Sequence, residues 1–386
     1  MTRPGPRTLP FWPPATIALA QIGAGLPSPA YAHYRARLGL VDGEVTALFA
    51  ILVSLVMASL WWSRSAAAGR RRGELLMAAL GAAAAGDVLF VLAGSYLEIA
   101  VASALEGVAV GLACGLAPAA TVAALPDAER AGRWVTVANA AGMAAGPVLA
   151  GLGNEFLPLP YALVYLVHAL ACLVAAVPLV RAAPGTAPPV TTTVAPGGTL
   201  TRTRLRTTLA TGYLSFCVGG LFVSLTAVLV KDVLLLDSAV AAGALIAAFF
   251  TANGLAGGLL ARHPRKARRS GTALFVTGLV LAAVALYSGN LALLASASVG
   301  AGAGQGALVG GSVAVAARAD SERGGNDAVA LFFFWSYGGT ASAALVVGWL
   351  SGFTGPRAAF LAMLGIAVAG LVCVALVSEE KGKAYA

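Results

Sequence analysis

The stretch that decides the fold is Gly142-Met-Ala-Ala-Gly146-Pro147-Val-Leu-Ala-Gly151, in the middle of an apolar run over residues 134–153. Glycine and proline destabilise a helix in water. In a membrane they are tolerated, because neighbouring helices accept the freed carbonyl groups and small residues let backbones approach closely. We therefore expect a bent, closely packed transmembrane helix here. A generic packing face with glycines four residues apart is the alternative interpretation.

The composition places most of the chain in a membrane. Of its 386 residues, 59% are hydrophobic and 11% are charged, and so much apolar surface does not fit one soluble core. The apolar runs are continuous rather than alternating, which favours helices. Spans of about 20 residues, each able to cross a hydrocarbon core of about 30 Å, are predicted at 13–32, 45–62, 75–94, 98–122, 134–153, 161–180, 207–230, 239–260, 271–288, 291–316, 327–350 and 357–378.

The second half of the chain repeats the plan of the first. The basic loop at 262–269 lies between the second and third helices of its half, as the basic stretch at 69–72 does in the first half. The predicted fold class is therefore an all-α membrane protein with twelve transmembrane helices in two pseudo-symmetric six-helix bundles, 1–182 and 207–386. The residues between them, 183–206, are rich in Pro, Thr and Arg, which predicts a flexible cytoplasmic linker.

The distribution of charge predicts the orientation. A net charge of +9 would suggest a nucleic-acid partner in a soluble protein. Here, a cytoplasmic N-terminus would place 21 of the 25 Lys and Arg residues inside and four outside, which is the positive-inside bias. We expect a multi-pass protein of the inner or plasma membrane with both termini in the cytoplasm, a monomer with no nucleic-acid partner. The four cysteines all fall within predicted spans, so no disulfide framework is expected.

Three segments resemble the major facilitator superfamily. The pattern Gly-x-x-x-Gly-Pro-x-x-Ala-Gly at 142–151 resembles the antiporter motif of the fifth helix, in which the last two positions are usually both glycine. Residues 25–31, Gly-Leu-Pro-Ser-Pro-Ala-Tyr, resemble the end of the first helix in actinobacterial-type drug-efflux members. That resemblance favours an uncleaved first helix over a signal peptide cut after Ala32. Residues 65–72, Ser-Ala-Ala-Ala-Gly-Arg-Arg-Arg, resemble the signature loop between helices 2 and 3.

Two positions depart from the family pattern. Ala66 stands where the signature loop usually carries an acidic residue, and Ser103 stands four residues before Gly107, where an arginine is frequent. The resemblance still implies a conformational role for the small and basic residues of the two motifs. These residues are Gly142, Gly146, Pro147 and Gly151 in the fifth helix, and Gly69, Arg70 and Arg71 in the loop.

Two acids in the middle of predicted spans are the candidates for proton coupling. Asp87 and Glu106 lie about equally far from the turn at 95–97, and an ionised carboxylate inside a span costs about 2.5 to 3.5 kcal/mol. We expect Glu106 to carry the coupling proton, because the fourth helix faces the cavity in the superfamily, with Asp87 as a partner that could share it. The alternative for Glu106 is a neutral hydrogen-bonding residue. A lone His168 is more typical of packing than of proton transfer.

The expected function is secondary transport by alternating access. Polar and aromatic residues expected in the substrate cavity are Gln21, Asn139, Gln305, Trp335 and Tyr337. The chain has no nucleotide-binding loop and no metal-binding cluster, so neither a cofactor nor an enzymatic activity is expected. The resemblance implies export of small amphipathic, drug-like molecules driven by protons. Uptake of a metabolite and a sensor or scaffold that kept the fold without transport are the alternatives.

Overall fold

The computed structural model covers the whole chain and describes residues 11–65, 71–125, 128–182, 202–236, 238–260, 263–323 and 327–383. Within these residues every regular element is a helix, and none is a strand. The elements are α1 (Trp12–Gly25), α2 (Pro27–Leu38), α3 (Asp42–Trp62), α5 (Arg72–Leu92), α6 (Tyr96–Ala124), α7 (Ala128–Phe156), α8 (Leu163–Ala182), α9 (Arg202–Val228), the π-helical turn η1 (Leu229–Val233), α10 (Ala239–Leu260), α11 (Pro264–Ser288), α12 (Leu291–Arg323), α13 (Asp327–Thr354) and α14 (Pro356–Lys383).

The twelve predicted spans all coincide with helices. Nine helices of the described part are long and apolar enough to cross a membrane. The first predicted span is divided at Leu26, where Pro27 and Pro29 remove two backbone donors, and α2 carries it on to Leu38. Gly39, with φ of 67°, ends α2 in the left-handed conformation. The seventh predicted span is α9 followed by η1.

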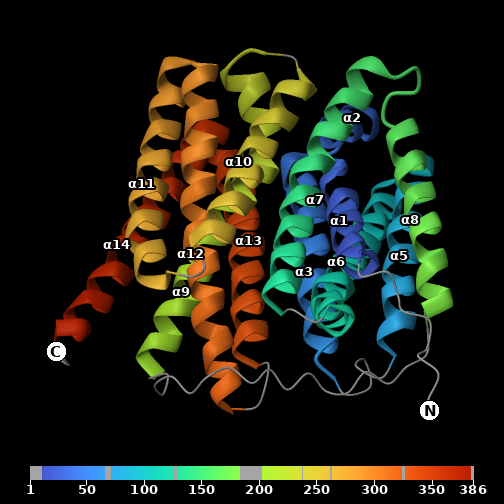
Figure 1. Cartoon of the computed structure of the whole chain (residues 1–386). Coiled ribbons are helices and arrows are strands. Elements are labelled where there is room, and N and C mark those ends of the chain that lie inside the picture. The colour runs from blue at the N-terminus through green and yellow to red at the C-terminus, as the bar shows by residue number, and fades with distance from the viewer. Residues whose placement is uncertain are drawn as a thin grey trace, which may run out of the picture. The chain divides into compact units, whose positions relative to one another are not determined.

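The chain divides into two compact units. Unit 1 comprises residues 1–190 and 238–247, and unit 2 comprises residues 191–237 and 248–386, so the first part of α10 belongs to unit 1. Helices of one unit lie side by side in bundles (Figure 1). The same helix pairs recur in both: α1 packs on α7 as α9 packs on α13, α5 on α6 as α11 on α12, and α5 on α8 as α11 on α14. This recurrence is the duplication that the sequence predicts.

Glycine spacing makes the duplication visible at the level of residues. In α6, glycines 107, 111 and 115 meet α3 and the Ser63 that follows it, and a Cβ at any of them would clash. In α12, glycines 302, 306 and 310 meet the backbone of α10 in the same way, at Phe249, Asn253 and Gly257. Glycines four residues apart lie on one face of a helix and allow close backbone approach. The glycine-rich segment at 302–306 is therefore a packing face within α12.

Large apolar side chains remain exposed along the outside of the helices. On α8 the exposed residues include Leu166, Leu170, Leu173, Val174 and Val177, each between 43% and 62% exposed. A soluble protein rarely exposes so continuous an apolar surface, whereas in a bilayer this surface meets lipid. The buried side of the same helix carries Tyr165, His168 and Cys172.

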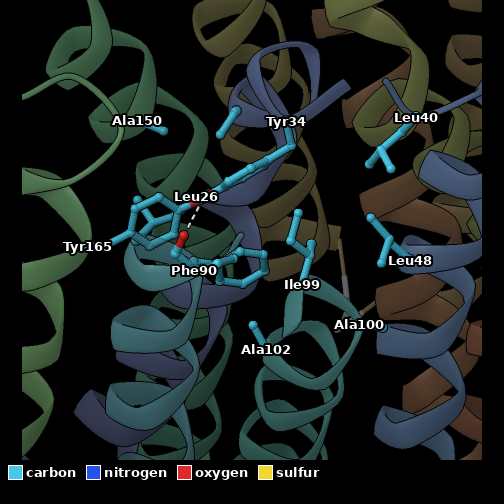
Figure 2. Close-up of a cluster of buried hydrophobic side chains, with 12 residues drawn as sticks. Leu26, Tyr34, Leu40, Leu48, Phe90, Ile99, Ala100, Ala102, Ala150 and Tyr165 are labelled. Atoms are coloured by element: carbon cyan, nitrogen blue, oxygen red, sulfur yellow. Dashed lines mark hydrogen bonds between the residues drawn. The ribbon is translucent and has the colours of Figure 1, made fainter. Parts of the chain in front are cut away.

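An apolar cluster in unit 1 lies beside these residues. It joins α2, α5, α6 and α8 through Tyr34, Phe90, Ile99 and Tyr165 (Figure 2). The Tyr34 hydroxyl donates a hydrogen bond of 2.9 Å to the Phe90 carbonyl, and the rings of Phe90 and Tyr165 stack with their centroids 5.4 Å apart. The cluster is therefore held by both packing and a buried hydrogen bond.

A buried acid and histidine site in unit 1

Three titratable side chains from three helices meet inside unit 1. Asp87 of α5 and Glu106 of α6 are both 0% exposed, and His168 of α8 is 5% exposed. The helices bring them together because α5 packs against both α6 and α8. The structure thus places the two predicted acids in one site and adds a histidine to it. Buried charges are costly unless they are paired or neutralised, so the protonation of this site is tightly constrained.

The histidine ring is fixed at both nitrogens. The distance from His168 Nδ1 to Asp87 Oδ2 is 2.6 Å, and the distance from His168 Nε2 to the carbonyl oxygen of Leu19 in α1 is 2.9 Å. A carbonyl oxygen only accepts hydrogen bonds, so Nε2 carries a hydrogen and donates it. His168 therefore connects α8 to α5 through a side chain and to α1 through the backbone.

Glu106 lies against two glycines. A Cβ at Gly86 of α5 would sit 3.1 Å from Glu106 Oε1. A Cβ at Gly23 of α1 would sit 2.5 Å from Glu106 Oε2 and 2.9 Å from His168 Cε1. The carboxyl oxygen and the Cε1 edge of the imidazole therefore share the space over Gly23. Within the described residues, neither Glu106 oxygen has a hydrogen-bond partner, which makes Glu106 the least satisfied polar group of the site.

The site also contains a set of ligand atoms that a metal ion would recognise. Asp87, His168 and Cys172 each offer one atom within 4.8 Å of the others, and Cys172 Sγ lies 3.6 Å from His168 Nε2. However, both ring nitrogens already make hydrogen bonds. Asp87 and Cys172 also approach opposite nitrogens of the ring, so a single ion could not bind His168 and both neighbours directly. The geometry favours a proton site over a metal site.

The antiporter-like segment of α7 packs against α1. Beta carbons at Gly142 or Gly146 would clash with α1 backbone, at Ala18 and Ile22 respectively. A Cβ at Gly25 would lie 2.8 Å from Pro147 Cδ, so the two segments that most resemble the superfamily touch each other. Farther along α7, Gly151 meets the backbone of residue 239, in the part of α10 that belongs to unit 1. Gly146 thus contacts α1, whereas the backbone of Pro147 lies against Gly243 of α10, which belongs to the predicted second six-helix bundle.

Two of the predicted cavity residues form one polar pair in unit 1. The side-chain amide of Gln21 in α1 donates a hydrogen bond of 2.7 Å to Asn139 in α7. Gln21 Nε2 also lies 3.6 Å from Cys114 Sγ of α6. Gln21 is two residues from Leu19, whose carbonyl holds His168. The polar pair and the acid and histidine site are therefore joined through one turn of α1.

An apolar pocket of about 820 Å³ lies in unit 1 between α1, α7 and α8. It reaches Leu19 on α1 and Ala171 on α8, one turn beyond His168. Its lining is apolar and aromatic apart from one arginine, and consists of Phe11, Trp12, Pro14, Ala15, Ala18, Leu19, Arg130, Trp134, Val137, Ala138, Ala171, Val174 and Ala175. This volume is in the range of pockets that hold small organic ligands. The buried site thus has the pocket on one side along α8 and the Tyr165 cluster on the other.

The remaining predicted cavity residues lie in unit 2 and do not form one site. Gln305 is 2% exposed; it accepts a hydrogen bond from Asn253 at 3.0 Å and donates one to the Ser215 carbonyl at 2.9 Å. The Tyr337 ring meets Phe216 edge to face with centroids 5.5 Å apart. Trp335 is 48% exposed. Gln305 therefore acts as a cross-link between helices of unit 2.

The signature loop lies largely outside the described residues. Ala66, Gly69 and Arg70 fall there, and the predictions made for them stay predictions. Arg71 is described, and its guanidinium pairs with Glu74 in the first turn of α5 at 2.6 Å. Both side chains are more than half exposed, so the pair contributes little to stability.

Sequence reasoning missed the partnership of Asp87 with His168. We judged the histidine to be a packing residue with satisfied hydrogen bonds, and both ring nitrogens are indeed engaged. The sequence did contain a signal for this partnership. Asp87 and His168, two of the rare polar residues in the predicted spans, fall on the third and sixth helices, and these two helices pack together in each repeat. Tyr161, the first residue of the predicted span 161–180, precedes α8 with φ of 62° and stacks on His33.

Comparison with known proteins identifies the relatives of this architecture. The family model of the Major Facilitator Superfamily matches residues 15–276, which is more than half of the chain. No curated protein matches the sequence of this chain. One similar solved structure is that of a bacterial homologue of the human lysosomal transporter Spinster, in an inward-facing and occupied conformation. It is 15% identical with a TM-score of 0.69, and the match covers 97% of this chain and 98% of that one. At this identity the likeness shows the fold alone.

Proposed function

Because the chain belongs to the major facilitator superfamily and is thus a secondary transporter, we propose that it exports small amphipathic, drug-like molecules in exchange for protons. The observation that carries the proposal is Glu106, a fully buried carboxyl group whose two oxygens have no partner among the described residues. An acid kept in the middle of a membrane span is a functional candidate by default, because its charged form is costly there. Glu106 is proposed to bind the proton that is exchanged for substrate, with Asp87 as its neighbour.

The apolar pocket supports the proposed substrate class. Its aromatic residues Trp12 and Trp134 suit a flat apolar molecule, and Arg130 supplies a polar element. Its contact with Leu19 gives a bound molecule a route to the proton site, because the carbonyl of the same residue holds His168. A molecule that shifts α1 would therefore shift His168 relative to Asp87. Substrate binding and proton binding would thus both change the position of α1, and coupling requires that two ligands act on the same conformational change.

The proposed orientation follows from charge. With both termini in the cytoplasm, 21 of the 25 basic residues lie on the inner side. The pocket, which begins at Phe11 and Trp12, would then open near the cytoplasmic surface, where an exporter collects its substrate. We propose a monomer in the cell membrane, with Gln21, Asn139, Gln305 and Tyr337 near the path of the substrate.

The test measures accumulation of two amphipathic dyes, ethidium and Hoechst 33342, in cells with and without the protein. The wild-type protein is expected to lower dye accumulation, and a protonophore should abolish the difference. Glu106→Gln preserves the shape and removes the charge, so it should abolish export driven by the proton gradient. The matched control is Glu98→Gln, an acid-to-amide change in the same helix at an exposed cap, where the carboxylate binds the backbone of Gly94 and Ser95.

The outcomes separate the competing functions. Higher dye accumulation in cells with the protein would support uptake instead of export. Export that resists the protonophore would contradict proton coupling. No effect of the wild-type protein on either dye would contradict drug export and favour a protein that has the fold without this transport. If Glu106→Gln exports both dyes with wild-type pH dependence, Glu106 does not carry the proton.

A further inference from the structure

The hydrogen bonds of His168 determine how many protons the Asp87 and His168 pair holds. The Leu19 carbonyl can only accept, so His168 Nε2 always donates its hydrogen there. The contact of 2.6 Å between His168 Nδ1 and Asp87 Oδ2 is a hydrogen bond only if one of the two atoms carries a hydrogen. The pair therefore holds one shared proton. Its net charge is zero whether the proton sits on the carboxyl group or on the ring.

Glu106 lies close enough to the His168 ring for its charge to act on the shared proton. Oε2 of Glu106 and Cε1 of His168 both lie within 3.0 Å of the point where a Gly23 Cβ would sit. Cε1 lies between the two ring nitrogens, so its C–H edge becomes more positive when the ring becomes an imidazolium ion. A positive edge facing a carboxylate in a medium of low dielectric is a favourable arrangement. The charge of Glu106 and the location of the shared proton are therefore linked.

From this geometry we propose that Asp87 and His168 form a one-proton switch that responds to the charge of Glu106 by changing which of the two side chains carries the shared proton. When Glu106 releases its proton, the shared proton moves from Asp87 Oδ2 to His168 Nδ1, so the O–H bond breaks and an N–H bond forms. When Glu106 is protonated again, the shared proton returns to Asp87. The pair remains neutral throughout, and only the proton of Glu106 leaves the site. The inference rests on the proposed role of Glu106 in transport and adds His168 as the residue that positions charge beside it.

The surroundings leave few other groups that could act in this way. Among the described residues, the side chains that interact electrostatically with Asp87 or Glu106 are Cys172 and Tyr165 on α8 and Tyr31 on α2, and Tyr34 of α2 interacts in turn with the two tyrosines. The Tyr34 hydroxyl donates to the Phe90 carbonyl. Cys172 lies 3.6 Å from Nε2, on the far side of the ring from Asp87. Residues 12–25 of α1 include no titratable side chain, so α1 contributes only the Leu19 carbonyl. Among all these groups, His168 alone is a base that can become a cation.

The first experiment observes the ring directly and needs no substrate. The full-length protein, labelled with ¹⁵N-histidine and placed in lipid nanodiscs, is followed by NMR over a pH titration, and a His168→Gln sample assigns the signal among the three histidines. We expect Nε2 to stay protonated throughout and the Nδ1 signal to shift with pH toward its protonated position as Glu106 ionises. In Glu106→Gln that shift should disappear. A ring with hydrogen on Nδ1 and a bare Nε2 would overturn the inference, as would an Nδ1 shift that is unchanged in Glu106→Gln.

The second experiment separates a proton role from a structural one. Asp87→Asn keeps the shape and the ring tautomer, because the amide can donate to Nδ1, but it removes the shared proton. In proteoliposomes with an imposed pH gradient and ethidium as probe, this variant should lose the dependence of efflux on the gradient. Glu98→Gln, outside the site, should behave as wild type. Gradient-dependent efflux in Asp87→Asn equal to that of wild type would show that the pair only connects helices.

The two experiments distinguish failure of the inference from failure of the proposed function. If the wild-type protein shows no proton-dependent efflux of ethidium but the Nδ1 signal of His168 still depends on the ionisation of Glu106, the switch exists and the proposed export is wrong. If efflux is coupled to protons while the ring does not respond to Glu106, the proposed function stands and the switch is wrong. Should Asp87→Asn fail to fold, the comparison of wild type with Glu106→Gln by NMR still decides.

Discussion

The contact between α1 and α7 predicts the effect of a single added methyl group. A Cβ at Gly146 would lie 2.5 Å from the Ile22 carbonyl oxygen and 3.0 Å from Gly25 Cα. Both are backbone atoms, so no side chain can rotate away. Restoring an ordinary separation of about 3.5 Å requires the helices to part by roughly 1 Å, which forfeits up to half of the attraction at each contact. Overpacking of this kind costs about 1–3 kcal/mol, and Gly146→Ala should destabilise unit 1 by that amount.

The assay is thermal unfolding of the purified protein in detergent, followed by tryptophan fluorescence. For a domain of about this size, a loss of about 1–3 kcal/mol lowers the melting temperature by roughly 2–12 °C. The matched control is Gly81→Ala in α5, where a Cβ would meet nothing within 4 Å. Alanine is the better helix former by about 0.5–1 kcal/mol, so this control should hold or raise the melting temperature. A Gly146→Ala protein as stable as the Gly81→Ala protein would refute the argument from close packing.

Two further predictions follow from orientation and from the buried site. A reporter that is active only in the cytoplasm should be active when inserted within 188–197 and inactive at Gly355, because the basic residues lie mostly on the predicted inner side; the opposite pattern would reverse the topology. Gly23→Ala should insert in the membrane yet lose the dependence of dye export on pH, because the new methyl group would separate Glu106 from His168. Export with wild-type pH dependence in Gly23→Ala would argue against a direct link between those two side chains.

Much of the fold was predictable because the bilayer restricts the choices. Continuous apolar runs must be helical, since no water is present to satisfy an exposed backbone, and the twelve predicted spans all coincide with helices. The break in the first span was not predicted, although Pro27 and Pro29 carry the signal for it. The extension of α2 through Arg35 and Arg37 was not predicted either, because their charges suggested a loop. In the last turn of a helix, however, these charges complement the helix dipole.

The candidate site was predictable in part. Its acidic residues could be identified because charged residues are rare in membrane spans, but their contacts could not, because these depend on how the helices pack. Asp87 and Glu106 stand out in any apolar sequence. Their histidine partner does not, because it lies 81 residues beyond Asp87 in the chain. The Leu19 carbonyl that fixes the ring is a backbone atom and has no signature in sequence at all. Polar side chains in spans identify a site, and helix packing then decides which of them share a proton.

Ser103 shows why that sharing matters in this chain. The superfamily often has an arginine at this position, and a permanent cation one turn from Glu106 would stabilise an ionised carboxylate at all times. Here the position is a fully buried serine, which carries no charge. In the proposed switch the positive charge comes instead from a group that can gain and lose it, namely His168 beside Asp87. A fixed cation makes the charge of an acid constant, whereas a histidine makes it depend on a proton, as the proposed proton coupling requires.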